Sequence, residues 1–534
     1  MKRKLSLILA LVLLSMSAFS AAFAEPAQEI VFALQNEPDG IDPGITNNSF
    51  ASPFLANCFE GLVTYDTSTG SLIGGNAESW TISEDGTVYT FKLREGLKWS
   101  DGSPLTAKDY VYAYQRILKP ETTAQYVSLL TSYIVGAQEF YDGTGSADAL
   151  GVKALDDTTL ELTLKTATPY FIDILTMWTF SPVQQATIDK NADHWTASPE
   201  TYVCNGPFMI SEMNLGESVV LVKNPKYYDA DKVKLEKITF RYITDPATAL
   251  LAYEASEIDG SRTVPPSDYA RLKAEAVGVV VVPAYGTVFY NFNCAKAPFD
   301  NVLVRKAFSL AIDRTSLIND VVQIDATPAY SNVSPGYSID GVDFVDGRST
   351  FGLSPTADVE AAKAALSEAG YPDGAGFPEI TLSYYTSDTV KKVVEAMAEM
   401  LQTNLNIKIN ISNEEWSVYY PGVQAGNFDL CAMGWSGDYL HPMTFMPLLV
   451  TGDINNLGKY SNADYDALVA KAQVETDVVK AMDLMRQADA IASAQYPTLT
   501  LYYKSNMMLM KDKVTGYYLN PSDTLYLKTA EVVA

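Results

Sequence analysis

Short runs of alternating polar and apolar residues recur along the chain, and amphipathic segments with helical spacing separate them. Helices are predicted after Thr106, which fits an N-cap, after Asp300, and over 357–368, where Gly370 follows as a stop signal. The clearest predicted strands are 87–93, 160–164, 218–222 and 238–242. Without an internal repeat or a long low-complexity linker, this mixture predicts an α/β protein with several sheets.

The composition is that of a globular protein, with 47% hydrophobic and 19% charged residues. A chain of 534 residues exceeds what one hydrophobic core usually supports, so two or three lobes are expected. The 64 acidic and 38 basic residues give a net charge of −26, which argues against a nucleic-acid partner and against docking on anionic lipid. Two His and four Cys leave little material for a metal site, and we expect neither a metal nor a cofactor.

The start of the chain predicts a secretory signal peptide. Basic residues at 2–4 precede an apolar run over 5–14, and the Ala-Phe-Ala sequence of 22–24 supplies a cleavage site after Ala24. Cleavage leaves 510 residues with a net charge of −29, because the removed segment carries three positive and no negative charges. An uncleaved anchor is the alternative. No other stretch is long and apolar enough to cross a membrane.

The cysteines show no motif spacing; they are Cys58, Cys204, Cys294 and Cys431. An oxidising compartment permits disulfides, and four cysteines allow three full pairings, but free buried thiols are the expected state. Because Cys58 is the first cysteine, none is expected to carry a lipid anchor at the cleavage site.

A search for catalytic motifs finds none that is complete. The segment 434–438 (Gly-Trp-Ser-Gly-Asp) lacks the final glycine of a nucleophile elbow. His194 and His441 lie far apart and are expected to be satisfied or surface side chains. In 452–460, which loosely resembles a phosphate loop, Tyr460 stands where Ser or Thr must reach Mg²⁺. The sequence therefore predicts no catalytic residue, and a secreted hydrolase of peptides or glycans is the rival from another class.

Several short blocks follow one another over nearly the whole mature chain. They are 36–43 (NEPDGIDP), 59–62 (FEGL), 77–80 (AESW), 91–94 (FKLR), 99–102 (WSDG), 205–208 (NGPF), 298–300 (PFD), 304–307 (VRKA), 311–314 (AIDR) and 434–439 (GWSGDY). Each block alone is a weak signal. Their common order and spacing resemble extracellular solute-binding protein family 5, the oligopeptide- and dipeptide-binding proteins of ABC importers.

This resemblance implies an α/β fold of the type II (cluster C) periplasmic-binding-protein kind, with two ligand-clasping lobes and an extra lobe joined by a two-strand hinge. Lobe I is expected to combine 25–59, 184–285 and 506–534. Lobe II, the extra lobe, is expected over 60–183, and lobe III over 286–505. Closure about the hinge would bury the ligand between lobes I and III.

The resemblance also implies a ligand site around Asp438, which occupies the position of the counter-ion for the ligand's ammonium group. A buried ammonium needs such a partner, although a turn or cap role for Asp438 is the alternative. Trp435 and Tyr439 flank it, and Gly434 and Ser436 match positions that pair with the ligand through main-chain atoms.

Other matching positions lie elsewhere in the chain. Asn47 and Ser49 match the facing segment of lobe I, and Trp416 matches an aromatic wall of a side-chain pocket. Tyr126 and Tyr503 align more loosely with residues that line the cleft. For these three aromatic residues, ordinary core packing is the competing interpretation.

The sequence departs from the family where members that grip tri- and tetrapeptides carry Arg or His. Val390, Val423 and Ala432 stand at those positions. Three explanations remain open: a cation from elsewhere, a longer ligand whose C-terminus stays in solvent, or a non-peptide ligand such as an oligosaccharide or a metal chelate.

The implied function is a non-enzymatic, monomeric binding protein, either periplasmic or associated with the cell surface. Its expected partners are an extended oligopeptide and the permease subunits of an ABC importer with their ATPases. A peptide sensor built on the same fold is the nearest alternative, because fold does not fix function.

Overall fold

The computed structural model describes residues 26–191, 194–276, 278–339 and 341–534. The signal peptide predicted over 1–24 lies outside the described residues. Within these ranges, every helix is too short or too polar to meet the requirements of a membrane span.

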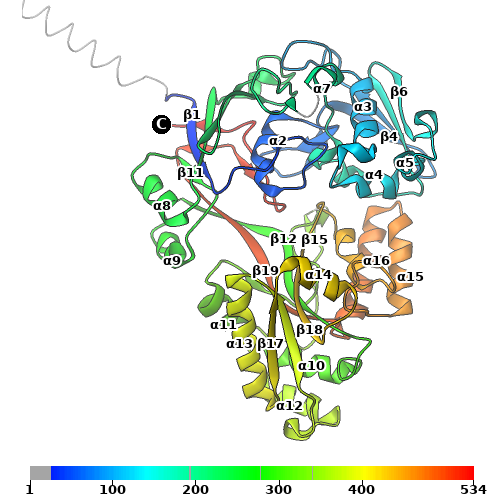
Figure 1. Cartoon of the computed structure of the whole chain (residues 1–534), viewed down its shortest axis with the longest axis vertical. Helices are drawn as coiled ribbons and strands as arrows, with labels where there is room; N and C mark the ends of the chain where they lie inside the picture. The colour runs from blue at the N-terminus through cyan, green and yellow to red at the C-terminus, as the bar shows by residue number, and fades with distance from the viewer. Residues whose placement is uncertain (1–25, 192–193, 277, 340) are drawn as a thin grey trace, which may run out of the picture.

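One mixed sheet of 11 strands runs through the molecule (Figure 1). Ten strands follow the order β17-β16-β18-β12-β19-β11-β1-β10-β9-β8, and β13 pairs with β19 beside them. Their bounds are β1 (Glu29–Leu34), β8 (Phe208–Asn214), β9 (Ser218–Lys223), β10 (Lys237–Tyr242), β11 (Gly260–Ser261), β12 (Val279–Phe292), β13 (Thr327–Pro328), β16 (Ile380–Tyr385), β17 (Ile409–Glu414), β18 (Leu430–Ser436) and β19 (Thr498–Met510).

The two longest strands, β12 and β19, pair antiparallel at the centre of this sheet. At about 3.4 Å per residue each spans about 45 Å. β19 pairs with β11 near Leu509, whereas β12 pairs with β18 from Gly286 onward. Figure 1 shows both strands running from an upper body, which holds β1 and β8–β11, to a lower body, which holds β16–β18. The β12–β19 register shifts between Pro283 and Thr287, next to the point where the pairing of β12 with β18 begins at Gly286.

A second sheet, in the order β4-β5-β7-β6, belongs to the upper body. Its strands are β4 (Ala77–Ile82), β5 (Val88–Leu93), β6 (Val152–Asp156) and β7 (Thr159–Thr163). All four predicted strands are confirmed to within one residue, two in this sheet and two as β9 and β10 of the large one. Two-stranded pairs complete the strands: β2 (Val63–Tyr65) with β3 (Leu72–Gly74), β14 (Ser338–Ile339) with β15 (Val342–Asp343), β20 (Val514–Thr515) with β23 (Glu531–Val532), and β21 (Tyr518–Leu519) with β22 (Leu525–Tyr526).

The three predicted helices form. In α3 (Ala107–Ile117), Thr106 Oγ1 accepts from the amide of Lys108, and Asp109 accepts from the amide of Thr106 at 2.7 Å. The helix after Asp300 is α10 (Val302–Leu310). The third, α12 (Val359–Glu368), begins two residues later than predicted, because Asp358 caps it by accepting from the amide of Ala361.

The remaining helices cover the faces of the two bodies (Figure 1). The upper body carries α2 (Ser52–Cys58), α4 (Val127–Tyr133), α5 (Ala137–Tyr141), α6 (Phe171–Ile174), α7 (Gln185–Asn191), α8 (Pro246–Glu254) and α9 (Pro266–Ala274). The lower body carries α11 (Arg314–Ser316), α13 (Asp388–Leu405), α14 (Trp416–Gln424), α15 (Ala463–Val474) and α16 (Val478–Ser493).

Two large hydrophobic cores are present, which agrees with more than one lobe being expected from the length of the chain. One fills the upper body and extends to α15 and α16, and the other lies between β16–β18 and the helices α10, α12 and α13. All four cysteines are free, and Cys58, Cys204 and Cys431 are buried. The expectation of free thiols is thus confirmed, and burial raises the pKa of the Cys431 thiol to about 12, which keeps it protonated.

Candidate functional site

The segment that follows β18 is held in place by its own backbone. Ser436 pairs with Gly286 of β12, and the amide of Gly437 donates to the carbonyl of Tyr285 at 2.7 Å. Thr444 Oγ1 accepts from the amide of Asp438 at 3.1 Å and from the indole of Trp435 at 3.3 Å. These contacts fix the main chain of Asp438 where β12 crosses between the two bodies.

Asp438 lines a cavity of about 220 Å³, which we call the aspartate pocket. Asn47 and Ser49 reach it from the start of the chain, and Tyr126 reaches it from the residue before α4. The amide of Asn47 donates to the side chain of Gln125 at 2.8 Å, which ties these two distant segments together. Ser436 and Tyr439 complete the set, so six predicted site residues meet at one pocket.

The carboxylate of Asp438 has neither an ion-pair nor a hydrogen-bond partner among the residues that the structure describes. Solvent reaches this side chain through the open pocket. The surrounding protein nevertheless displaces most of the bulk water, and this desolvation raises the pKa of Asp438 to about 6. Burial, and after it the negative charge of Asp438, raises the pKa of Tyr126 to about 12. The aspartate pocket therefore presents an unpaired anion that a ligand's cation can neutralise.

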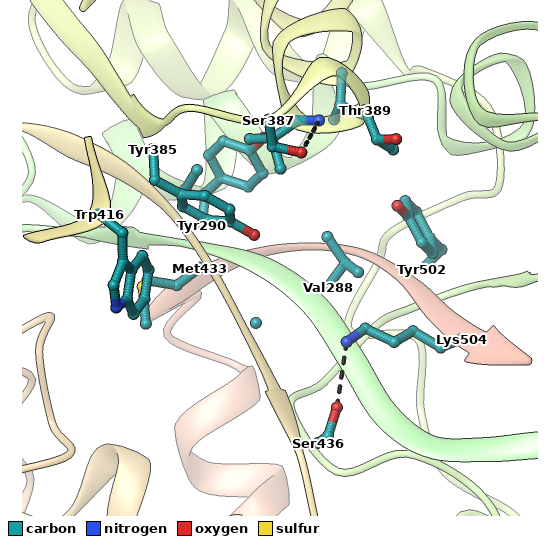
Figure 2. Close-up of a pocket in the computed structure, with 14 residues that line it drawn as sticks. Val288, Tyr290, Tyr385, Ser387, Thr389, Trp416, Met433, Ser436, Tyr502 and Lys504 are labelled. Atoms are coloured by element: carbon teal, nitrogen blue, oxygen red, sulfur yellow. Dashed lines mark hydrogen bonds between the residues drawn. The ribbon is translucent and has the colours of Figure 1, made fainter. Parts of the chain in front are cut away.

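A second cavity of about 370 Å³ adjoins the first, because Ser436 lines both. We call it the lysine pocket. Lys504 of β19 lies on its wall, as does Trp416 (Figure 2), and Gly434 is among its other residues. Tyr290, Tyr385 and Tyr502 face this space as well (Figure 2). Val390 and Ala432, two of the positions where family members carry Arg or His, also line the lysine pocket. The third position, Val423, is 2% exposed and packs in a separate core.

Trp416, the first residue of α14, is a pocket wall and not a core residue. Half of its surface (49%) is exposed. Its ring lies 5.0 Å from that of Tyr420 in a stacked arrangement and 5.1 Å from that of Tyr385, edge to face. An exposed aromatic plane held by two other rings is a ready contact surface for an apolar or planar ligand group.

Two more of the predicted aromatic residues, Tyr439 and Tyr503, are engaged within the protein. Tyr439 is 7% exposed and stacks on Tyr170, which stacks in turn on His441. Tyr503 is absent from the walls of both pockets: it is buried, and its hydroxyl accepts from Arg348 Nη1 at 3.0 Å and, at 3.3 Å, from the amides of Tyr330 and Ser331. Core packing therefore accounts for Tyr503.

Nine of the 14 residues that line the lysine pocket are not predicted from the sequence, among them Tyr290, Tyr385, Tyr502 and Lys504. A signal for two of them was present. In a strand, side chains alternate between faces, so Tyr502 and Lys504 share one face and the intervening Tyr503 takes the other. The alternation of Thr and Leu over 498–501 predicts this shared face, but it does not show that the face lines a pocket.

The histidines do not form a catalytic pair. His194 is exposed, whereas His441 is buried, which lowers its pKa to about 3, and its Nδ1 accepts from the amide of Met443 at 3.2 Å. Over the described ranges, no three His, Cys, Asp or Glu side chains gather in a way that could hold a metal ion.

Comparisons with known proteins agree with the sequence blocks. A family model described as bacterial extracellular solute-binding proteins, family 5 Middle, matches residues 71–456. The oligopeptide-binding protein OppA of Bacillus subtilis (strain 168) is 33% identical over 507 residues, which cover 93% of this chain and 91% of that protein.

Two solved structures are similar over their whole length. The unliganded open form of MppA, a periplasmic murein tripeptide binding protein, superposes with a TM-score of 0.83 at 32% identity and covers 95% of this chain and 98% of its own. Haemophilus influenzae OppA in complex with RPPGFSPFR superposes with a TM-score of 0.72 at 31% identity, and the match covers 96% of this chain and 100% of that one. The resemblance and the α/β fold inferred from the sequence are confirmed: this chain belongs to the bacterial extracellular solute-binding proteins of family 5.

Proposed function

We propose that this protein captures peptides with a free N-terminus between its upper and lower bodies and delivers them to an ABC import permease. The observation that carries the proposal is the unpaired carboxylate of Asp438, in a pocket lined by segments from distant parts of the chain. A peptide's ammonium supplies the charge that this pocket lacks. The name of the relative OppA, an oligopeptide-binding protein, supports the same ligand class.

The main chain of β18 offers a second means of peptide recognition. β16 pairs with β18 only at Leu430 and Cys431, whereas β12 pairs with it as far as Ser436. Residues 432–436 therefore leave one edge without a neighbouring strand in the part of the chain that the structure describes. An extended peptide that adds to such an edge gains affinity without its sequence being read, which fits the roles proposed for Gly434 and Ser436.

The lobe boundaries fit the same proposal. The proposed boundaries at 285/286 and 505/506 fall where β12 and β19 cross and their register shifts. Lobe I (25–59, 184–285 and 506–534) then holds β1 and β8–β11, lobe II (60–183) holds the second sheet, and lobe III (286–505) holds β16–β18. Closure bends the two strands at this crossing and brings Asn47 and Ser49 onto the peptide.

The first test is ligand-induced closure of the purified protein. Alanine peptides of two to eight residues are titrated by calorimetry, and small-angle scattering records the radius of gyration. We expect binding together with a smaller radius of gyration, because the higher TM-score with an unliganded open form supports an open starting state. N-acetylated peptides serve as controls and should bind only weakly, with little change in the radius of gyration at the same concentrations. Failure of every free peptide to bind would overturn the proposed function.

Peptide affinity should depend on pH in a defined direction. The pKa of Asp438 in the free protein is about 6, so below pH 6 most of its carboxyl groups are protonated. A protonated Asp438 must lose its proton before it can pair with an ammonium. Affinity should be constant between about pH 6 and pH 8 and should fall by up to about tenfold per unit below pH 6. Above about pH 8 the peptide's own amine loses its charge. Calorimetric titration from pH 4.5 to 9 measures this profile, and no decline below pH 6 would contradict the role of Asp438.

The remaining parts of the proposal concern partners and location. The protein acts as a non-enzymatic monomer, periplasmic or at the cell surface, and its partners are permease subunits with their ATPases. The lack of a nucleophile–base pair among the described residues supports a carrier over a hydrolase. Mass spectrometry of peptides incubated with the pure protein tests for cleavage. Loss of peptide uptake on gene deletion, with signalling unchanged, separates the carrier from a sensor.

A further inference from the structure

Lys504 lies where β12 and β19 lose their regular pairing. Its neighbour Ser505 pairs with Pro283, and its other neighbour Tyr503 pairs with Thr287, so three residues of β12 stand opposite this one position. Irregularities of this kind bend the bulged strand, here β12, and locally disrupt the ladder beside Lys504. Here the side chain of Lys504 extends along the lysine pocket, and its Nζ donates to Ser436 Oγ at 3.2 Å (Figure 2).

The ammonium of Lys504 has no acidic partner. Within the described ranges no carboxylate approaches its Nζ within 4.0 Å, and the hydroxyl of Ser436 is its one side-chain hydrogen-bond partner. Lys504 is half-buried, and desolvation lowers its pKa. Placing an ammonium away from water without a counter-ion is unfavourable, so the apo protein maintains this charge at a cost in stability.

The rest of the lysine pocket is neutral. Of the 14 described residues that line it, Lys504 is the one with a charge. The others are aromatic, aliphatic or hydroxyl-bearing, with Trp416 and Tyr385 on one side and Tyr502 beside the lysine (Figure 2). Such a pocket accepts an apolar side chain of a ligand together with one anionic group.

We propose that Lys504 binds a carboxylate of the peptide ligand, so that Asp438 and Lys504 together select a short peptide with charges at both ends. This inference rests on the proposed function and goes beyond it by naming the cation that the sequence lacked at Val390, Val423 and Ala432.

The spacing of the two charges fits a short ligand. One residue separates Ser436 from Asp438, so their α-carbons are at most about 7 Å apart. Lys504 Nζ is 3.2 Å from the Ser436 hydroxyl, and an extended peptide advances about 3.4 Å per residue. A peptide of two to four residues, lying along the free edge of β18, therefore places its ammonium at Asp438 and its terminal carboxylate at Lys504.

Calorimetric titration of Lys504→Met tests the proposal. The probes are dialanine, trialanine and tetra-alanine as free acids and as C-terminal amides, all with a free N-terminus. For the best-bound length, the substitution should weaken the free acid by about 30- to 100-fold and the amide by less than about threefold. Lys504→Arg, which retains the charge, should recover part of the affinity for the acid. Lys471→Met, on an exposed position of α15, should change neither.

A third group of probes identifies the source of the carboxylate. These probes are peptides with an amidated C-terminus and one Glu, so their carboxylate is on a side chain and not at the C-terminus. Selective loss of these amides in Lys504→Met, with the free acids unaffected, supports carboxylate recognition and places the group on a side chain.

Other outcomes overturn the proposal. An equal loss for the acid and the amide means that Lys504 acts only by holding Ser436 at the end of β18. If Lys504→Met binds every probe as tightly as the wild-type protein does, Lys504 has no role in ligand binding. The proposed peptide-capture function would still hold in that case, because the wild-type protein binds the peptides. If the wild-type protein binds neither acids nor amides, the function and this inference fail together. Thermal unfolding of each variant checks that it is folded.

Discussion

Replacement of Asp438 by Asn is expected to weaken the binding of peptides with a free N-terminus by about 30- to 1,000-fold. The substitution keeps the size and shape of the side chain but removes the anion that pairs with the ligand's ammonium. On closure, that ammonium would enter a pocket where desolvation is already strong enough to raise the pKa of Asp438 to about 6. An ammonium buried there without a counter-ion accounts for the size of the loss. Calorimetric titration with the best-bound alanine peptide measures it.

The ligand supplies the decisive control for this experiment. An N-acetylated peptide has no ammonium, so its weak binding should differ little between the wild-type protein and Asp438→Asn. Glu399→Gln removes a negative charge from the exposed surface of α13 and should leave both affinities unchanged, which separates a local ion pair from the effect of net charge. Equal losses for free and acetylated peptides would mean that Asp438 serves only to shape the turn after β18.

The local structure of this protein follows from short sequence patterns. Strands such as β5 and β9 show the alternation of a half-buried sheet, and α3 begins where Thr106 and Asp109 can satisfy its first amides. These features depend on neighbouring residues, so they can be read without knowing the fold. The order of strands in the large sheet cannot be predicted in this way, because β12 pairs with β19 although some 200 residues separate them in the chain.

The two charged residues of the site show the same contrast. Asp438 was identified from its sequence block, since the pattern around it resembles a family. By itself, an Asp after a glycine looks like a turn residue. Lys504 carried no such mark, because a lysine in an alternating strand usually projects into solvent. Its importance depends on the register shift in β12 and on the neutral walls around it, which come from four separate stretches of the chain.

The second large effect concerns stability and lies in the first sequence block. Asp42 is buried and accepts both arms of the guanidinium of Arg116, from Nη1 at 3.0 Å and from Nη2 at 2.6 Å. The indole of Trp195 donates to the same carboxylate at 2.9 Å, and the amide of Gly44 does so at 2.9 Å. One side chain thus joins the start of the chain, α3 of the proposed lobe II and a segment of the proposed lobe I.

We therefore expect Asp42→Ala to lower the free energy of unfolding by about 3–5 kcal/mol, because it leaves the guanidinium of Arg116 buried without its partner. Urea-induced unfolding followed by near-ultraviolet circular dichroism measures this loss. Lys108→Met is the matched control. Lys108 lies on the same helix as Arg116, and breaking its exposed pair with Asp157 should leave the unfolding curve nearly unchanged. The double variant Asp42→Ala/Arg116→Met should be less destabilised than the sum of the two single variants, since it removes the stranded charge. If the double variant lost stability additively, Asp42 and Arg116 would be acting independently, and the block around Asp42 would owe its role to backbone shape instead of to this ion pair.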